Sequence, residues 1–345
     1  MLKKLKQATL GTLKTSGVFR FVENSRWRQH RLLILAYHGI SLDDEHQWDP
    51  SLYMTPDYFR RRMQLVKDSN CTVLPLAEAV RSLYRQDLPE KCVALTFDDG
   101  TYDFYKEAHP ILREFDFPVT VYLTTYYSDY PKPVFDGICS YLLWKGRDTR
   151  LDLREITGQE ITLDLSDEDL RVSCIEELRK FARDHELSAE EKDSLAASIA
   201  AHLKIDYDAL RAKRLLQILS PDEVRTLATE GVDIQLHTHR HRVPSERSLF
   251  LREIDDNRNR IQSMTGTFAS HFCYPSGVYD KAFLPWLEEA GIVSATTCTL
   301  GFASRQSHPL LLPRLLDTSA LSDIEFEGWL TGVAAAMPRR KEVKS

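Results

Sequence analysis

The sequence lacks several features that would place it in a common functional class. Its six cysteines are scattered without a CxxC pair, which argues against a zinc ribbon or zinc knuckle. No apolar run approaches the ~18–20 residues that a membrane-spanning helix needs. A glycine-rich phosphate loop and a GxSxG nucleophile elbow are also missing. The chemistry of this chain must therefore be sought in other motifs.

The composition is that of an ordinary globular chain. Of 345 residues, 43% are hydrophobic and 28% are charged, which excludes a disordered chain or a coiled coil. The net charge of −6 gives no basic footprint, so we expect no nucleic-acid partner. The length predicts one large domain or two modest ones. We expect the cysteines to be reduced and mostly buried, as in a cytosolic protein.

The first 30 residues form a separate, strongly basic segment. They show no secretory hydrophobic region and no small-residue cleavage site, so we expect a cytoplasmic location. Leucines at helical spacing predict a helix that either lies on an anionic membrane surface or packs on the folded domain. Because the chain also ends in basic residues, peripheral contact with the inner membrane through both basic ends is one hypothesis.

Strand-like and helix-like segments alternate along most of the chain. Apolar runs predict strands at 32–38, 71–75, 92–97, 119–125, 232–238, 270–275 and 292–298. Buried strands that alternate with amphipathic helices indicate a parallel sheet, and at least six of them favour a barrel. We therefore predict an α/β barrel over residues 31–320.

Two segments fall outside this alternation. Residues 137–218 are charged and helical in pattern, which predicts a helical insertion between two barrel strands or a small separate domain. Residues 321–345 predict a C-terminal helix that begins after Ser322 and is followed by a basic tail.

Three clusters of residues follow predicted strands, where an α/β barrel keeps its active site. In the first, Asp98 and Asp99 directly follow a buried strand and precede Gly100. Two adjacent carboxylates there are costly unless they bind something, although a helix N-terminus would also explain them.

The second cluster is His237-Thr238-His239-Arg240-His241. If the strand ends there and the chain turns, His237 and His241 can converge and bind a divalent metal. A histidine-rich polar loop is the alternative. The third cluster, residues 272–277, contains a Pro-x-Gly turn that can aim backbone N–H groups into a pocket or be a plain turn.

Together these clusters resemble the polysaccharide deacetylases of carbohydrate esterase family 4, also called NodB-homology domains. The similarity rests on TFDDG at 96–100, His-Thr-x-x-His at 237–241, the proline–glycine turn and YHGI at 37–40. It covers residues ~31–136 and ~219–317 and implies a deformed (β/α) barrel that carries the 137–218 insertion.

The resemblance also implies an activity: metal-dependent removal of an N- or O-acetyl group, with N-acetyl expected first, from a glycan or glycan precursor. By that resemblance Asp98 would be the general base, and Asp99, His237 and His241 would bind the metal. Zinc is the first expectation, with Co, Ni, Mn or Fe as alternatives. The backbone N–H of Ser276 would bind the oxyanion.

Two departures from the family pattern leave roles open. Many members have an arginine near the position of Cys273 that holds the base aspartate, and Arg314 is the candidate replacement. The usual histidine that serves as general acid is not visible; His308 and His239 are candidates. We expect His38 and Tyr274 to contact substrate. Two alternative functions remain, an amidase for a small non-sugar substrate and a non-catalytic glycan-binding protein.

Overall fold

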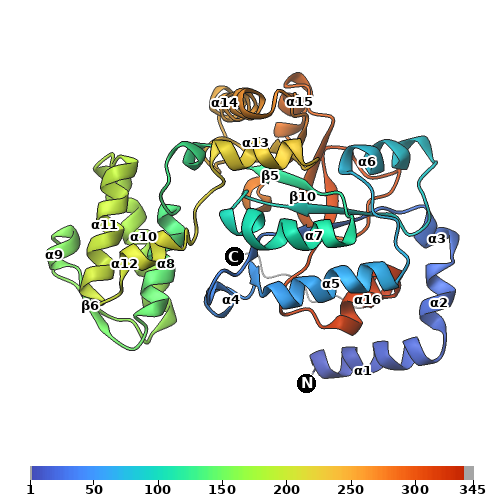
Figure 1. The fold of residues 1–345 in the computed structure, drawn as a ribbon, viewed down its shortest axis with the longest axis horizontal. Helices are drawn as coiled ribbons and strands as arrows, with labels where there is room; N and C mark the ends of the chain where they lie inside the picture. Colours follow the sequence, from blue (N-terminus) through green and yellow to red (C-terminus); the bar gives the residue numbers. More distant parts are fainter. Residues whose placement is uncertain (1, 338–345) are drawn as a thin grey trace.

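Seven parallel strands close into a barrel in the computed structural model, which describes residues 2–337 (Figure 1). The strands are β1 (Leu33–Tyr37), β4 (Val93–Phe97), β5 (Thr120–Leu123), β8 (Asp233–Leu236), β9 (His271–Cys273), β10 (Ser294–Leu300) and β11 (Leu312–Leu316). Their order around the barrel is β1-β11-β10-β9-β8-β5-β4, and β4 closes onto β1. The predicted barrel is confirmed.

Alternation along the strands separates the barrel interior from its helical coat. Leu33, Leu35 and Tyr37 of β1 pack with the outer helices, whereas residues between them face inward. The register pairs Tyr37 of β1 with Phe97 of β4. Because the strands are parallel, the residues after each strand meet at one rim.

The outer layer consists mainly of helices that follow the strands. They are α5 (Pro56–Asp68), α7 (His109–Phe115), α13 (Pro221–Thr229), α14 (Arg247–Thr265), α15 (Phe283–Glu289) and α16 (Asp323–Thr331). By contrast, α6 (Leu76–Arg85) packs against inward-facing barrel residues, among them Ile34 and Ala94. The helix predicted after Ser322 is α16, and Ser322 forms its capping box with Glu325.

Two details of the predicted strands need correction. Segment 71–75 is not a barrel strand: it makes only an isolated bridge from Val73 to Val93, because β1 and β5 already flank β4. Arg314, the candidate replacement arginine, lies inside β11, a strand that the apolar runs did not predict.

The insertion forms a helical lobe beside the barrel (Figure 1, left). It contains α8 (Phe135–Lys145), α9 (Arg154–Thr157), α10 (Glu168–Asp184), α11 (Ala189–His202) and α12 (Tyr207–Ala212). These helices bury a hydrophobic core of their own. The lobe also holds a short antiparallel hairpin of β6 (Arg150–Asp152) and β7 (Thr162–Asp164), whose mostly exposed three-residue strands leave no apolar run to predict.

The lobe is anchored at the rim where the strands end. Its entry and exit are joined by a hydrogen bond from the Val134 N–H to the Leu216 carbonyl, 2.8 Å long. The Leu219 N–H then donates to the carbonyl of Gly100, directly after the two aspartates, at 2.9 Å. The insertion therefore stands over the part of the barrel where active-site residues gather.

The basic N-terminal segment packs on the domain. It forms α1 (Leu2–Thr15), α2 (Val18–Glu23) and α3 (Arg26–Gln29), with α1 against α16. Lys6 pairs with Glu325 at 3.1 Å. The predicted basic tail 338–345 lies outside the described residues. Within residues 2–337, no helix has both the length and the apolar character to cross a bilayer.

Candidate functional site

The two aspartates after β4 face different partners. The Asp98 N–H donates to the Tyr37 carbonyl at 2.9 Å and so continues the β1–β4 ladder. Asp99 and Gly100 then take left-handed backbone conformations, with φ of 67° and 75°. Such conformations are unfavourable for a non-glycine residue and cluster at functional sites. The turn separates the two neighbouring carboxylates.

Asp98 is held by Arg314 inside the barrel. Arg314 Nη1 donates to Asp98 Oδ1 at 2.7 Å, and Nη2 donates to Oδ2 at 2.8 Å. The side chains of both residues are buried. Burial alone would raise the pKa of Asp98, but the adjacent guanidinium outweighs it and lowers that pKa to about 2. Asp98 is therefore ionised and fixed in orientation.

Cys273 at the end of β9 lies against the same arginine. Its Sγ is 3.2 Å from Arg314 Nη2, while Arg314 Nε donates to the Thr297 carbonyl at 3.1 Å. A thiol is much smaller than a guanidinium, so Cys273 leaves room in the barrel for Arg314. The structure thus brings Arg314, the predicted replacement arginine, to Asp98, and it shows Cys273 beside them.

Asp99 forms the second half of the site with two histidines. Its Oδ1 lies 3.1 Å from His237 Nε2 and 3.3 Å from His241 Nε2. His237 Nδ1 is 2.9 Å from the Cys273 carbonyl, which can only accept. His237 therefore carries its proton on Nδ1, and the Nε2 lone pair is directed toward Asp99.

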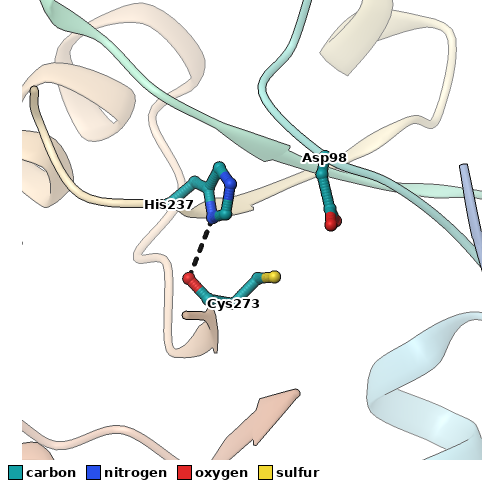
Figure 2. Close-up of side chains that lie close together, drawn as sticks. All are labelled: Asp98, His237 and Cys273. Carbon is teal, nitrogen blue, oxygen red and sulfur yellow. Dashed lines mark hydrogen bonds between the residues drawn. The ribbon is translucent and has the colours of Figure 1, made fainter. Parts of the chain in front are cut away.

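These three side chains have the donor set of a metal site. One oxygen and two imidazole nitrogens lie within 4.8 Å of one another, and such a set suits zinc and similar divalent ions. Asp98, His237 and Cys273 form a second compact group (Figure 2). That group is buried and already contacts the Arg314 cation, which disfavours a metal there. The geometry therefore favours Asp99, His237 and His241.

Asn257 holds the backbone of His237 in place, and no sequence pattern predicted Asn257 as a site residue. Its Oδ1 accepts from the His237 N–H at 2.9 Å. Its Nδ2 donates to the Leu123 carbonyl and to Thr125 Oγ1, both at 2.9 Å. This buried amide on α14 thus ties the ends of β5 and β8 together.

Two further predicted residues lie at the same rim. His38 Nε2 is 3.6 Å from Asp98 Oδ2, and its side chain is partly exposed. Ser276 is exposed in the turn after β9, with a left-handed φ of 54°. Its predicted part in binding the oxyanion stays a prediction.

Three predicted residues do not join the site. Tyr274 is fully buried in the outer core, and its hydroxyl donates to the Leu310 carbonyl at 3.1 Å, so it cannot contact substrate as expected. His308 precedes β11 and therefore lies at the opposite rim of the barrel. His239 Nδ1 is 2.9 Å from Thr125 Oγ1, and the ring packs edge-on against Tyr126.

A cleft of about 680 Å³ adjoins the candidate metal centre. Asp99 and His241 line it on the barrel side, and α8 and α10 line it on the lobe side. Aromatic residues from the rim, from α4 (Glu45–Trp48) and from the start of α8 also border it, namely Trp48, Tyr53, Tyr126, Tyr127 and Phe135. A cleft with aromatic walls and a few polar groups is the usual form of a ligand site.

Comparison with known proteins agrees with this geometry. The family model described as polysaccharide deacetylase matches residues 85–163 and 190–295. The Bacillus subtilis (strain 168) protein YxkH, a provisionally named polysaccharide deacetylase, is 34% identical over 94 residues. That match spans 27% of this chain and 32% of the relative, so it covers about a third of the relative's length.

A second curated relative matches over a shorter share of its own length. The poly-β-1,6-N-acetyl-D-glucosamine N-deacetylase of Escherichia coli (strain K12) is 28% identical over 94 residues. The match spans 27% of this chain and 14% of that protein.

Solved structures share the fold. The Streptococcus pyogenes deacetylase PplD, determined in complex with acetate, aligns with a TM-score of 0.55 at 21% identity, over 85% of this chain and 94% of that one. IcaB from Ammonifex degensii aligns with a TM-score of 0.53 at 14% identity, over 87% and 97% of the two chains.

Proposed function

The chain belongs to the polysaccharide deacetylase family, and on that premise we propose that it hydrolyses an acetyl group, N-acetyl in preference to O-acetyl, from a glycan or glycan precursor. One observation carries the proposal: Asp98, fixed by Arg314, lies next to the Asp99-His237-His241 donor set. An oriented base beside a candidate metal site is the arrangement needed for hydrolysis by a metal-activated water.

The chain's own residues have distinct tasks in this reaction. A divalent ion held by Asp99, His237 and His241 would supply Lewis acidity and lower the pKa of water. Asp98 accepts the proton of the water that attacks the acetyl carbon, and Arg314 keeps the carboxylate aligned. When the carbon–nitrogen bond breaks, the departing amine takes up a proton. We assign this proton to His38, and its Nε2, 3.6 Å from Asp98 Oδ2, supports the assignment.

The test is acetate release from N-acetylglucosamine oligomers by protein reconstituted with zinc, cobalt or manganese. We expect release by the wild type and at least about a 100-fold loss in Asp98→Asn. Simple amides assayed in parallel would expose an amidase for non-sugar substrates. Oligomer binding without acetate release under every metal would favour the non-catalytic glycan-binding alternative and reject hydrolysis.

We further propose a cytoplasmic location with peripheral contact at the inner membrane. The N-terminal helices support it, because Leu5 and Phe21 are 63% and 78% exposed beside Lys3, Lys4 and Arg20. In flotation with anionic vesicles, Leu5→Gln/Phe21→Gln should reduce bound protein. The control Leu249→Gln/Phe268→Gln changes exposed apolar residues elsewhere. Equal flotation of both variants and the wild type would reject the contact.

A further inference from the structure

The cleft beside the candidate metal centre is rich in positive charge, although the whole chain has a net charge of −6. Its lining includes five cationic side chains: Arg179, Arg183, Lys192, Arg240 and Arg242. The acidic side chains that line it are Asp99, Asp136 and Glu186. Cationic side chains therefore outnumber acidic ones in this cleft, whereas acidic residues are in excess over the whole chain.

Two of the five cations are neutralised by the protein itself. Arg179 pairs with Asp136 at 2.9 Å. Arg240 pairs with Glu253 at 3.0 Å. These two arginines therefore have structural partners.

The other three cations have no such partner. Within residues 2–337, no carboxylate lies at ion-pair distance from Arg183, Lys192 or Arg242. Among the cleft carboxylates of residues 2–337, only Glu186 has no ion-pair partner, because Asp99 contacts the histidines and Asp136 pairs with Arg179. The cleft is left with three free cations against one free carboxylate, so its charge is not explained by the stability of the fold.

The three free cations come from both sides of the cleft. Arg183 lies on α10 and Lys192 on α11, both in the lobe. Arg242 directly follows His241 on the barrel side. A ligand that reached the candidate metal centre would therefore pass between cations of both walls. The aromatic side chains of Trp48, Tyr126 and Tyr127 line the same space and offer surfaces for sugar rings.

We propose that the acetylated substrate carries an anionic group, a phosphate ester or a carboxylate, which binds to Arg183, Lys192 and Arg242. This inference rests on the proposed deacetylase function and names its substrate class. Arginine forms strong charge-assisted hydrogen bonds with both groups, and a lysine adds a point charge. A neutral glycan would cover these cations without pairing them, at a desolvation cost.

The test compares three matched probes with the metal-reconstituted full chain. They are an N-acetylglucosamine tetramer, the same tetramer with a phosphate at its reducing end, and the tetramer oxidised there to a carboxylate. We expect at least one charged tetramer to show about tenfold higher kcat/KM than the neutral one at low salt, and added NaCl to reduce that ratio. The better charged probe identifies the anion.

Matched variants locate the effect. The triple variant Arg183→Ala/Lys192→Ala/Arg242→Ala should bring the charged-to-neutral ratio close to one. The control variant Arg81→Ala/Arg85→Ala/Lys281→Ala removes three exposed cations elsewhere and should keep the wild-type ratio. A ratio near one in the wild type, or an unchanged ratio in the triple variant, would overturn the inference while acetate release still supports the deacetylase. No acetate from any probe would instead reject the proposed function.

Discussion

Arg314 and Asp98 join two strands that do not touch. Arg314 belongs to β11 and Asp98 follows β4, and β1 lies between these strands in the barrel. Their double hydrogen bond therefore crosses the interior, where both side chains are almost completely buried. Both oxygens of the proposed base are engaged by one rigid, planar group, which fixes the carboxylate more firmly than a lysine could.

We expect Asp98→Asn to separate catalysis from metal binding. Asparagine keeps the size of the side chain but cannot accept a proton, so kcat should fall at least about 100-fold. Metal content per chain should stay at the wild-type level, because Asp99, His237 and His241 are intact. Acetate release and elemental analysis measure the two quantities, and Asp208→Asn, at an exposed position, is the control. Wild-type turnover in Asp98→Asn would exclude Asp98 as the base.

Removal of Arg314 should destabilise the fold as well as the site. Arg314→Met leaves the buried Asp98 carboxylate without a counter-charge, a change that usually costs about 3–5 kcal/mol. The double variant Asp98→Asn/Arg314→Met removes both charges and should recover much of that loss. Urea unfolding of the wild type and the variants measures these free energies. If the double variant lost the sum of the free energies lost by Asp98→Asn and Arg314→Met singly, the pair would not be energetically coupled.

Because Cys273 contacts Arg314, we expect that an arginine at position 273 can replace the one at position 314. In Arg314→Ala the carboxylate loses its partner, and activity should fall. Adding Cys273→Arg supplies a guanidinium from β9, at the position that many family members use. The double variant Cys273→Arg/Arg314→Ala should regain at least about tenfold of the lost kcat/KM, as expected for a restored charge-assisted bond. Cys273→Ser/Arg314→Ala, which adds no charge, should regain nothing.

Metal content should depend on His237 and His241 together. The wild type is expected to hold one divalent ion per chain after reconstitution and dialysis, and the variant His237→Ala/His241→Ala should hold almost none. His239→Ala should retain the ion, since that ring contacts Thr125 instead. Elemental analysis measures the number of divalent ions bound per chain in each protein. Full occupancy in the double variant would place the metal elsewhere.

Stability should fall with rising pH because of Asp103. This buried carboxyl accepts hydrogen bonds from the Ile40 N–H at 3.1 Å and from Thr101 at 3.0 Å. Burial nevertheless raises its pKa to about 8, far above the value of about 4 expected in the unfolded chain. The folded state therefore favours the protonated form, and this stabilising effect is complete below pH ~4 and lost as pH rises through ~8.

The variant Asp103→Asn cannot ionise, so its Tm should change less than that of the wild type between pH 4 and 8. Asp208→Asn, at a position 95% exposed, serves as the control and should follow the wild type. Thermal scans across this range would refute the assignment if Asp103→Asn kept the full wild-type pH dependence.

The residues at strand ends could be predicted because parallel strands share a rim. TFDDG and the 237–241 histidines each follow an apolar run, so barrel topology alone brings them together. Strand alternation explains why Tyr274 does not contact substrate: Cys273 faces the interior, so its neighbour faces the helices. The rim that His308 occupies depends on where β11 begins, and the apolar runs predicted no strand at 312–316.

Other features leave no local trace in the sequence. Asn257 lies in the middle of a helix, and only the packing of α14 against β8 brings its amide to His237. The charge of the cleft likewise depends on how the lobe is set against the barrel, since Arg183 and Arg242 are far apart in the chain.

The base of the insertion also bears on how this protein could have diverged. The chain leaves and returns through residues 133–134 and 216–217, which lie side by side in an antiparallel bridge. Because the two ends of the lobe meet, the barrel strands on either side of it, β5 and β8, pair directly with each other. Sequence divergence within the lobe would therefore change one wall of the cleft, which α8 and α10 line, while Asp98, Asp99, His237 and His241 kept their places on the barrel.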